Sequence, residues 1–146
     1  MTKQTYQFDD IEDLQRKLEI ERDGVEVEIP GDRFLTLRAA SDGNPLWKKQ
    51  AESILNEMGR LRNAKASAER LREFLAEKYA TLIIKSWRGV KIGGQEIEYN
   101  PELGLAFLLQ AFDVYTIVDG FVWDTKNYRT QRARVIVDDA KNSSAG

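Results

Sequence analysis

The sequence has 146 residues, a formal net charge of −2, and neither cysteine nor histidine. A chain of this length can form one domain with a buried core. Without those two side chains it has no thiol nucleophile, disulfide or imidazole base, and no metal site built on them. The first residues do not form a signal peptide and no apolar run is long enough to cross a bilayer, so we expect a soluble protein without membrane contact.

Residues 1–24 form an acidic N-terminal segment in which we expect one short helix. The pair Asp9-Asp10 can cap the start of this helix. The apolar residues Ile11, Leu14 and Leu18 then fall on one face.

Residues 25–39 carry the pattern of a β-hairpin. Val25, Val27 and Ile29 alternate with glutamates, which is typical of a half-buried strand. Pro30-Gly31-Asp32 is turn chemistry, and an apolar run returns after it. Because an isolated hairpin is only marginally stable, we expect it to pack on helices or to pair with another copy.

A first long helix is predicted over about residues 45–62. Asn44 is a good N-cap, and Pro45 suits the first helical position, where its missing N–H costs nothing. Apolar residues then follow at spacings of four and three, which gives a narrow stripe that packs against another helix: Trp47, Ala51, Ile54, Met58 and Leu61.

Two further helices are predicted, over about residues 67–88 and 101–122. In the first, Trp87 lies near the C-terminal end and Gly89 is placed to adopt the left-handed closing conformation. The second opens with Asn100-Pro101 and is apolar nearly all round, so it is either the central helix or partly covered by another chain, and we favour a mixture of both.

These elements predict a mainly α fold of the α+β class, with a small N-terminal β-hairpin packed on a bundle of about three to four helices. Residues 25–128 form the single domain, and residues 129–146 form a basic and then flexible C-terminal tail.

Charge is unevenly distributed along the chain. Residues 1–30 hold nine acidic and four basic residues, whereas residues 60–91 hold nine basic and three acidic residues. Such a split is typical of solvated faces, or of two ends that attract each other in an oligomer.

Features that could suggest catalysis or ligand binding have simpler explanations. The pairs Asp9-Asp10 and Asp138-Asp139 are sequence neighbours, which seldom have the facing geometry of an acid–base pair. The segment 89–94 lacks the form of a phosphate-binding loop and fits a hairpin-like turn. Asp113 and Asp119 point to different sides of a helix. We expect no enzymatic activity, no cofactor and no metal.

A basic segment near the C-terminus, residues 126–134, mixes cations with Tyr128 and could follow a nucleic-acid backbone. The run is short and the chain as a whole is acidic, so nucleic-acid binding is not the favoured function.

The order of motifs resembles a known family. Asn44-Pro45-x-Trp47 opens one helix, Trp87-x-Gly89-Val90 ends the next, and a Gly-Gly turn leads to Tyr99-Asn100-Pro101-Glu102. This is similar to tail assembly chaperones of long-tailed (siphovirus-like) bacteriophages, which often carry a Trp-x-Gly-Val … Gly … Tyr-Ser-Pro-Glu signature. Asn100 replaces the serine and is also a competent N-cap. The resemblance covers about residues 44–128.

This resemblance implies a helical, self-associating protein of the host cytoplasm that is absent from the finished virion. Such proteins coat the apolar, helical tape-measure protein before the tail tube polymerises, and a longer frameshifted form often accompanies them. Alternatives are a structural head–tail or tail component of the virion, and a small nucleic-acid-binding or regulatory module.

The surplus apolar surface of residues 103–122 gives a hypothesis for the binding site. A chaperone must expose apolar surface reversibly, and a client helix could lie between the second and third predicted helices. We expect client or self-association contacts from four side chains: Leu105, Leu108, Phe112 and Tyr115.

Overall fold

The computed structural model describes residues 5–130 and 134–135 of the chain. In chain order its elements are η1 (Glu12–Leu14), α1 (Leu18–Asp23), β1 (Val25–Ile29), β2 (Arg33–Leu37), α2 (Pro45–Asn63), α3 (Ala68–Lys78), η2 (Tyr79–Ile83), β3 (Ile84–Arg88), β4 (Lys91–Ile92), β5 (Gln95–Glu96), α4 (Pro101–Gln110), α5 (Phe112–Val122), η3 (Thr125–Tyr128) and β6 (Arg134–Val135). Of the three short helices, η1 and η3 are 3₁₀ turns and η2 is a π-helical turn. The predicted α+β class is confirmed.

A four-stranded sheet in the order β3-β2-β1-β6 organises the fold. β1 and β2 pair antiparallel with Val27 opposite Leu35, as the predicted hairpin requires. β3 joins the other side of β2 in the antiparallel sense, and β6 runs parallel to β1. The hairpin therefore lies inside a larger sheet, which supplies the support that an isolated hairpin lacks.

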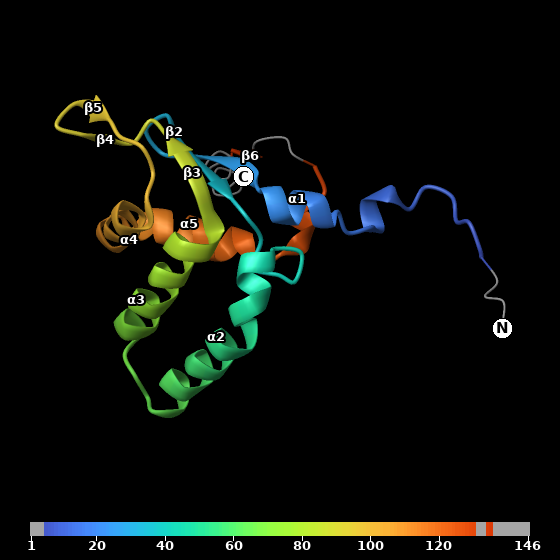
Figure 1. The fold of residues 1–146 in the computed structure, drawn as a ribbon, viewed down its shortest axis with the longest axis horizontal. Helices are drawn as coiled ribbons and strands as arrows, with labels where there is room; N and C mark the ends of the chain where they lie inside the picture. The colour runs from blue at the N-terminus through green and yellow to red at the C-terminus, as the bar shows by residue number, and fades with distance from the viewer. Residues whose placement is uncertain (1–4, 131–133, 136–146) are drawn as a thin grey trace, which may run out of the picture.

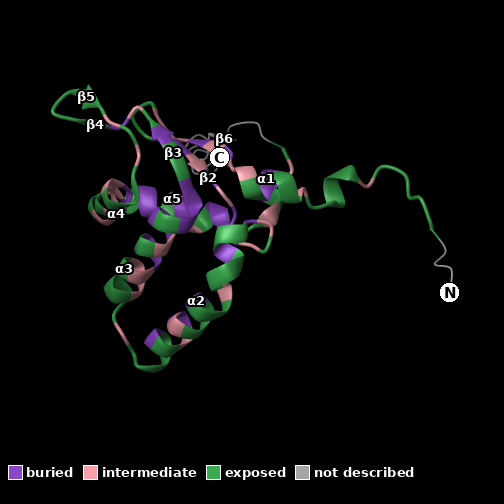
Figure 2. Ribbon diagram, viewed as in Figure 1, coloured by how far each residue is buried: buried purple, intermediate pink, exposed green. Residues whose placement is uncertain are grey.

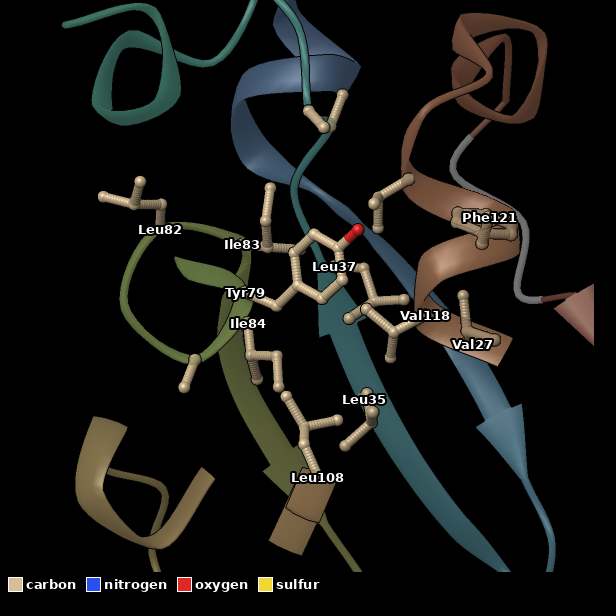
Figure 3. Close-up of a cluster of buried hydrophobic side chains, with 14 of the residues drawn as sticks. Val27, Leu35, Leu37, Tyr79, Leu82, Ile83, Ile84, Leu108, Val118 and Phe121 are labelled. Carbon is tan, nitrogen blue, oxygen red and sulfur yellow. The ribbon is translucent and has the colours of Figure 1, made fainter. Parts of the chain in front are cut away.

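Helices α4 and α5 pack beside the sheet, and α2 and α3 project from it as a pair (Figure 1). Burial is concentrated in the sheet and α5, whereas the projecting pair is mostly exposed (Figure 2). In Figure 3, Tyr79 lies among Leu37, Ile83 and Val118, which belong to three different elements. The core is thus made where α5 and η2 meet the inner face of the sheet.

Asn44 starts α2 as predicted and also joins distant segments. Its side-chain oxygen accepts a hydrogen bond from the backbone N–H of Leu46, 3.1 Å away. Its amide nitrogen donates to the backbone oxygens of Ala39 and Leu82, each at 3.0 Å. Asn44, Ala39 and Leu82 are all buried, so water cannot readily replace the Asn44 amide as a donor to either carbonyl group.

The predicted helix over residues 67–88 is wrong in its second half. α3 ends at Lys78, the chain widens into η2, and Ile84–Arg88 is a strand paired with β2. The β-branched residues Thr81, Ile83 and Ile84 lower helix propensity and suit a strand. The open edge of β2 gives this segment hydrogen-bond partners that helical periodicity alone does not reveal.

The predicted continuous helix over residues 101–122 is also wrong. α4 and α5 are separate helices that meet at Ala111, where the backbone leaves the helical region, with an angle of 110° between their axes. A straight helix that is apolar all round would leave part of its surface uncovered. The bend lets α4 pack on α3 and η2, while α5 packs on the sheet.

At the two ends of the chain the predictions hold only in part. Instead of one helix with a buried face there are two short pieces, η1 and α1, and Leu14 and Leu18 are exposed. Most of the predicted flexible C-terminal tail, like Asp138-Asp139, falls outside the described residues.

Glu21 is a fully buried carboxylate at the base of the N-terminal segment. Arg16 donates to both of its oxygens, at 2.5 and 3.1 Å, and the Ser41 hydroxyl donates at 2.6 Å. Burial acts to raise the pKa of Glu21, but these hydrogen bonds outweigh it and hold the pKa below its ordinary value of 4.5. Arg16 also binds Asp42 at 2.7 Å.

Replacing Asn44 with alanine should destabilise the protein by about 2–4 kcal/mol, because a helix cap is lost and two buried carbonyl groups lose their donor. Asn100→Ala is the matched control: it removes an exposed cap at α4 and should cost about 1 kcal/mol. Urea unfolding of both variants measures the difference. Equal losses would show that the bonds to Ala39 and Leu82 add nothing.

Glu21→Gln should lower the free energy of unfolding at pH 7 by about 1.5–3 kcal/mol, since charged hydrogen bonds are lost. The pKa of Glu21 is lower in the folded protein than in the unfolded chain, so Glu21 of the unfolded chain binds a proton first as the pH falls. The stabilisation by the Glu21 carboxylate is therefore present above pH 4.5 and is lost as the pH falls through the folded-state pKa. Unfolding titrations from pH 7 to pH 3 should show the two proteins converging. Glu19→Gln, an exposed change on the same helix, should have the same free energy of unfolding as the wild type at every pH.

Candidate partner-binding surface

The predicted motif residues around Trp87 form a packed corner. The Trp87 ring makes edge contacts with Tyr99 and Phe107, with centroids 4.8 and 5.5 Å apart, and its ring N–H donates to the backbone oxygen of Ile97 at 2.9 Å. These contacts hold the segment that follows β5 against both β3 and α4. The role of Trp87 is therefore to hold the β4–β5 hairpin and α4 in place.

Two glycines permit this corner. Gly89 has φ +83, as predicted, but it follows a strand and not a helix, and a Cβ there would lie 2.5 Å from the backbone oxygen of Asp32. Gly104 leaves space for the Tyr99 ring, whose hydroxyl donates to the backbone oxygen of Ala80. Burial raises the pKa of Tyr99, so it remains a neutral donor.

A second aromatic group joins α2 to α5. Trp47, three per cent exposed, stacks on Tyr79 at 6.4 Å and meets the edge of Trp123 at 5.3 Å. The Tyr79 hydroxyl donates to Asp119 and accepts from the Trp123 ring N–H. Burial, and then the bond to Asp119, raises the pKa of Tyr79. Trp47 and Tyr79 are core residues, and neither is available to stack on a base.

An open apolar cleft lies next to this group, between the first turns of α3 and α5. It has a volume of about 440 Å³, and its wall is formed by Ala68, Glu69, Leu71, Arg72, Phe112 and Tyr115. We call it the α3–α5 cleft. The Phe112 side chain is 58% exposed, and the Arg72 guanidinium lies 5.1 Å from the centre of its ring. Burial, and then the charge of Asp119, raises the pKa of Tyr115 to about 12.

The structure separates the four predicted contact residues into two pairs. Phe112 and Tyr115 lie together in the cleft, with ring centroids 6.5 Å apart, although Tyr115 is itself only nine per cent exposed. Leu108 is fully buried in the core, and Leu105 is partly buried on α4 outside the cleft wall. A partner can therefore reach Phe112 directly but cannot reach Leu108 without disrupting the fold.

Sequence reasoning did not place Leu71 and Arg72 at this surface. By helical spacing, Leu71 belongs to the apolar face of its helix and Arg72 to the polar face. Only the 110° bend after α4 brings the start of α5 against them. Little in the sequence indicates this bend, because the Gln110-Ala111 step contains neither the glycine nor the proline that usually interrupts a helix.

The larger groove between α2 and α3, about 700 Å³, is polar. Charged side chains from both helices line it, among them Glu57, Arg60, Arg70 and Glu73. An apolar client helix would have to desolvate these charges, which is costly without exact pairing. The α3–α5 cleft is thus better suited to an apolar partner.

Neither an acidic cluster for a metal ion nor a single membrane-spanning helix occurs within residues 5–130. No group of three or more acidic side chains there is arranged to hold a metal ion. In the same part of the chain no single helix is both long and apolar enough to span a membrane, while α4 and α5 reach that length and composition only as a bent pair.

Comparison with known proteins gives a family. No curated protein and no solved structure matches the chain. A family model described as YdaY prophage protein matches residues 42–142, which include α2 to α5 and both aromatic groups. The match begins after the β1–β2 hairpin. Since it spans more than half of the chain, this protein belongs to the family of YdaY prophage proteins and is of phage origin.

Proposed function

We propose that this prophage protein is a tail assembly chaperone that self-associates and binds the apolar, helical tape-measure protein before the tail tube polymerises. The observation that carries the proposal is the α3–α5 cleft, where Phe112 is 58% exposed beside Leu71 and Tyr115. The prophage family and the motif order around Trp87 and Asn100 support the same function.

The cleft suits one apolar side chain of a helix, or two that are one turn apart. Covering the exposed part of Phe112 would contribute about 1–2 kcal/mol, which permits binding that is later reversed when the tube displaces the chaperone. Arg72 adds a cation beside the ring, so a carboxylate next to the apolar residues of the client would strengthen binding.

In this proposal the protein acts in the host cytoplasm, needs no cofactor and performs no catalysis. A longer frameshifted form would share the same cleft, because the cleft lies within residues 68–115. The basic C-terminal segment gives less support to nucleic-acid binding: Tyr128 is fully buried and its hydroxyl donates to the backbone oxygen of Arg38 at 3.0 Å.

Co-expression with the tape-measure gene of the same prophage tests the proposal. The wild-type protein should keep the tape measure soluble in a large complex. Phe112→Asp should leave it insoluble, because a buried carboxylate replaces the apolar contact, while the thermal midpoint of the variant stays within about 2 °C of the wild type.

Leu55→Asp is the matched control, since Leu55 on α2 is 56% exposed and lies outside the cleft wall. It should rescue the tape measure as well as the wild type does. Leu108→Asp should unfold the protein and does not test binding. A wild-type protein that leaves the tape measure insoluble, or that copurifies with finished virions, would argue for a structural tail component or a regulator.

A further inference from the structure

The N-terminal arm, residues 5–14, leaves the body of the protein at one end and extends away from it (Figure 1). Phe8 is 69% exposed and Leu14 is 73% exposed. The arm is held at its base by Arg16, which binds Glu21 and Asp42, and by Arg129, which donates to the Asp13 backbone oxygen at 2.9 Å. A fixed base and exposed apolar side chains are typical of a segment that binds elsewhere.

The arm has a distinctive charge. Its ten residues include four carboxylates and no basic side chain: Asp9, Asp10, Glu12 and Asp13. An apolar pocket that receives Phe8 should therefore have cations at its edge and no carboxylate in its wall.

One pocket in the described part of the chain has this combination. It lies between α4 and the β4–β5 hairpin, has a volume of about 270 Å³, and is formed mainly by apolar side chains that include Leu103, Phe107 and Ile92. We call it the hairpin pocket. Arg33 and Lys91 are its only charged residues, and Ile92 is 60% exposed.

These two cations are available for a partner. Arg33 donates to the backbone oxygen of Pro30 at 2.7 Å. Among the described residues, neither Arg33 nor Lys91 forms an ion pair. The α3–α5 cleft is less suitable for the arm, because its wall includes the carboxylate of Glu69 and a single cation, Arg72.

We propose that the N-terminal arm of one copy binds in the hairpin pocket of a second copy, with Phe8 in the apolar pocket and Asp9 and Asp10 paired with Arg33 and Lys91. A second copy is needed because the arm and the β4–β5 hairpin lie at opposite ends of the molecule (Figure 1). The stretch between Phe8 and Arg16, which is held in place, is short and spans at most about 3.5 Å per residue, and this limits how far Phe8 can lie from the base of the arm.

This inference deepens the self-association part of the proposed function by naming the segment and its receptor. It concerns the protein alone, so it is tested without the tape measure. A wild-type protein that assembles but does not bind the client would contradict only the chaperone function, and a wild-type protein that binds the client but stays monomeric would contradict only the arm.

Sedimentation or light scattering of the full chain at about 1–100 μM is the test. The wild type should form dimers or larger species whose mass rises with concentration. Phe8→Ser should weaken assembly by at least about tenfold, since one aromatic contact is lost. Leu55→Ser, an equally conservative change at an exposed apolar residue, should leave the mass unchanged.

Charge reversal identifies the receptor. Arg33→Glu with Lys91→Glu should weaken assembly, as should Asp9→Lys with Asp10→Lys, and combining the four changes should restore it. Lys48→Glu with Lys49→Glu, an exposed pair on α2, is the control for net charge. A wild type that stays monomeric overturns the proposal, as does assembly that depends on Phe8 but not on Arg33 and Lys91, or a combined variant that is not restored.

Discussion

The buried amide of Asn44 is the interaction on which the arrangement of the other elements depends. It fixes three backbone segments at one point: the chain after β2, the first turn of α2, and the end of η2. Once these are joined, α2 must leave the sheet at a set angle, and η2 must deliver the chain to the edge of β2 as strand β3. The aromatic contacts of Trp47 with Tyr79 and Trp123 then hold α2 to α5.

Local patterns predicted the elements whose partners are close in sequence. The alternation in Val25–Ile29 and the turn at Pro30-Gly31-Asp32 specified the hairpin, and Asn44-Pro45 specified the start of α2. Prediction failed where a distant partner decided the structure. Residues 84–88 carry a helical pattern from the preceding helix, yet β2, nearly fifty residues earlier, offers backbone hydrogen bonds that only the folded chain brings near.

The candidate site divides in the same way. An excess of apolar surface in residues 103–122 was evident from composition, but the bend at Ala111 decides which residues remain outside. It buries Leu108 and leaves Phe112 at a corner against Leu71 and Arg72. The exposed apolar surface of this site is therefore concentrated at one corner, which, in the chaperone function that we propose, would suit weak contacts repeated along a long client better than one large interface.

The chain passes from α3 through η2 into β3 without a loop. The β2–β3 pairing already contains a register shift at Thr36/Leu37, where Lys85 is the extra residue, and this shift lets Ile84 and Trp87 both face inward although they are three residues apart. A further insertion or deletion between the shift and Arg88 would turn Trp87 outward and an exposed neighbour inward. This stretch can change over evolution only by substitution at constant length. Changes in length within the family should instead collect in the α2–α3 connection and the β4–β5 turn, where neither the sheet register nor the core depends on the number of residues.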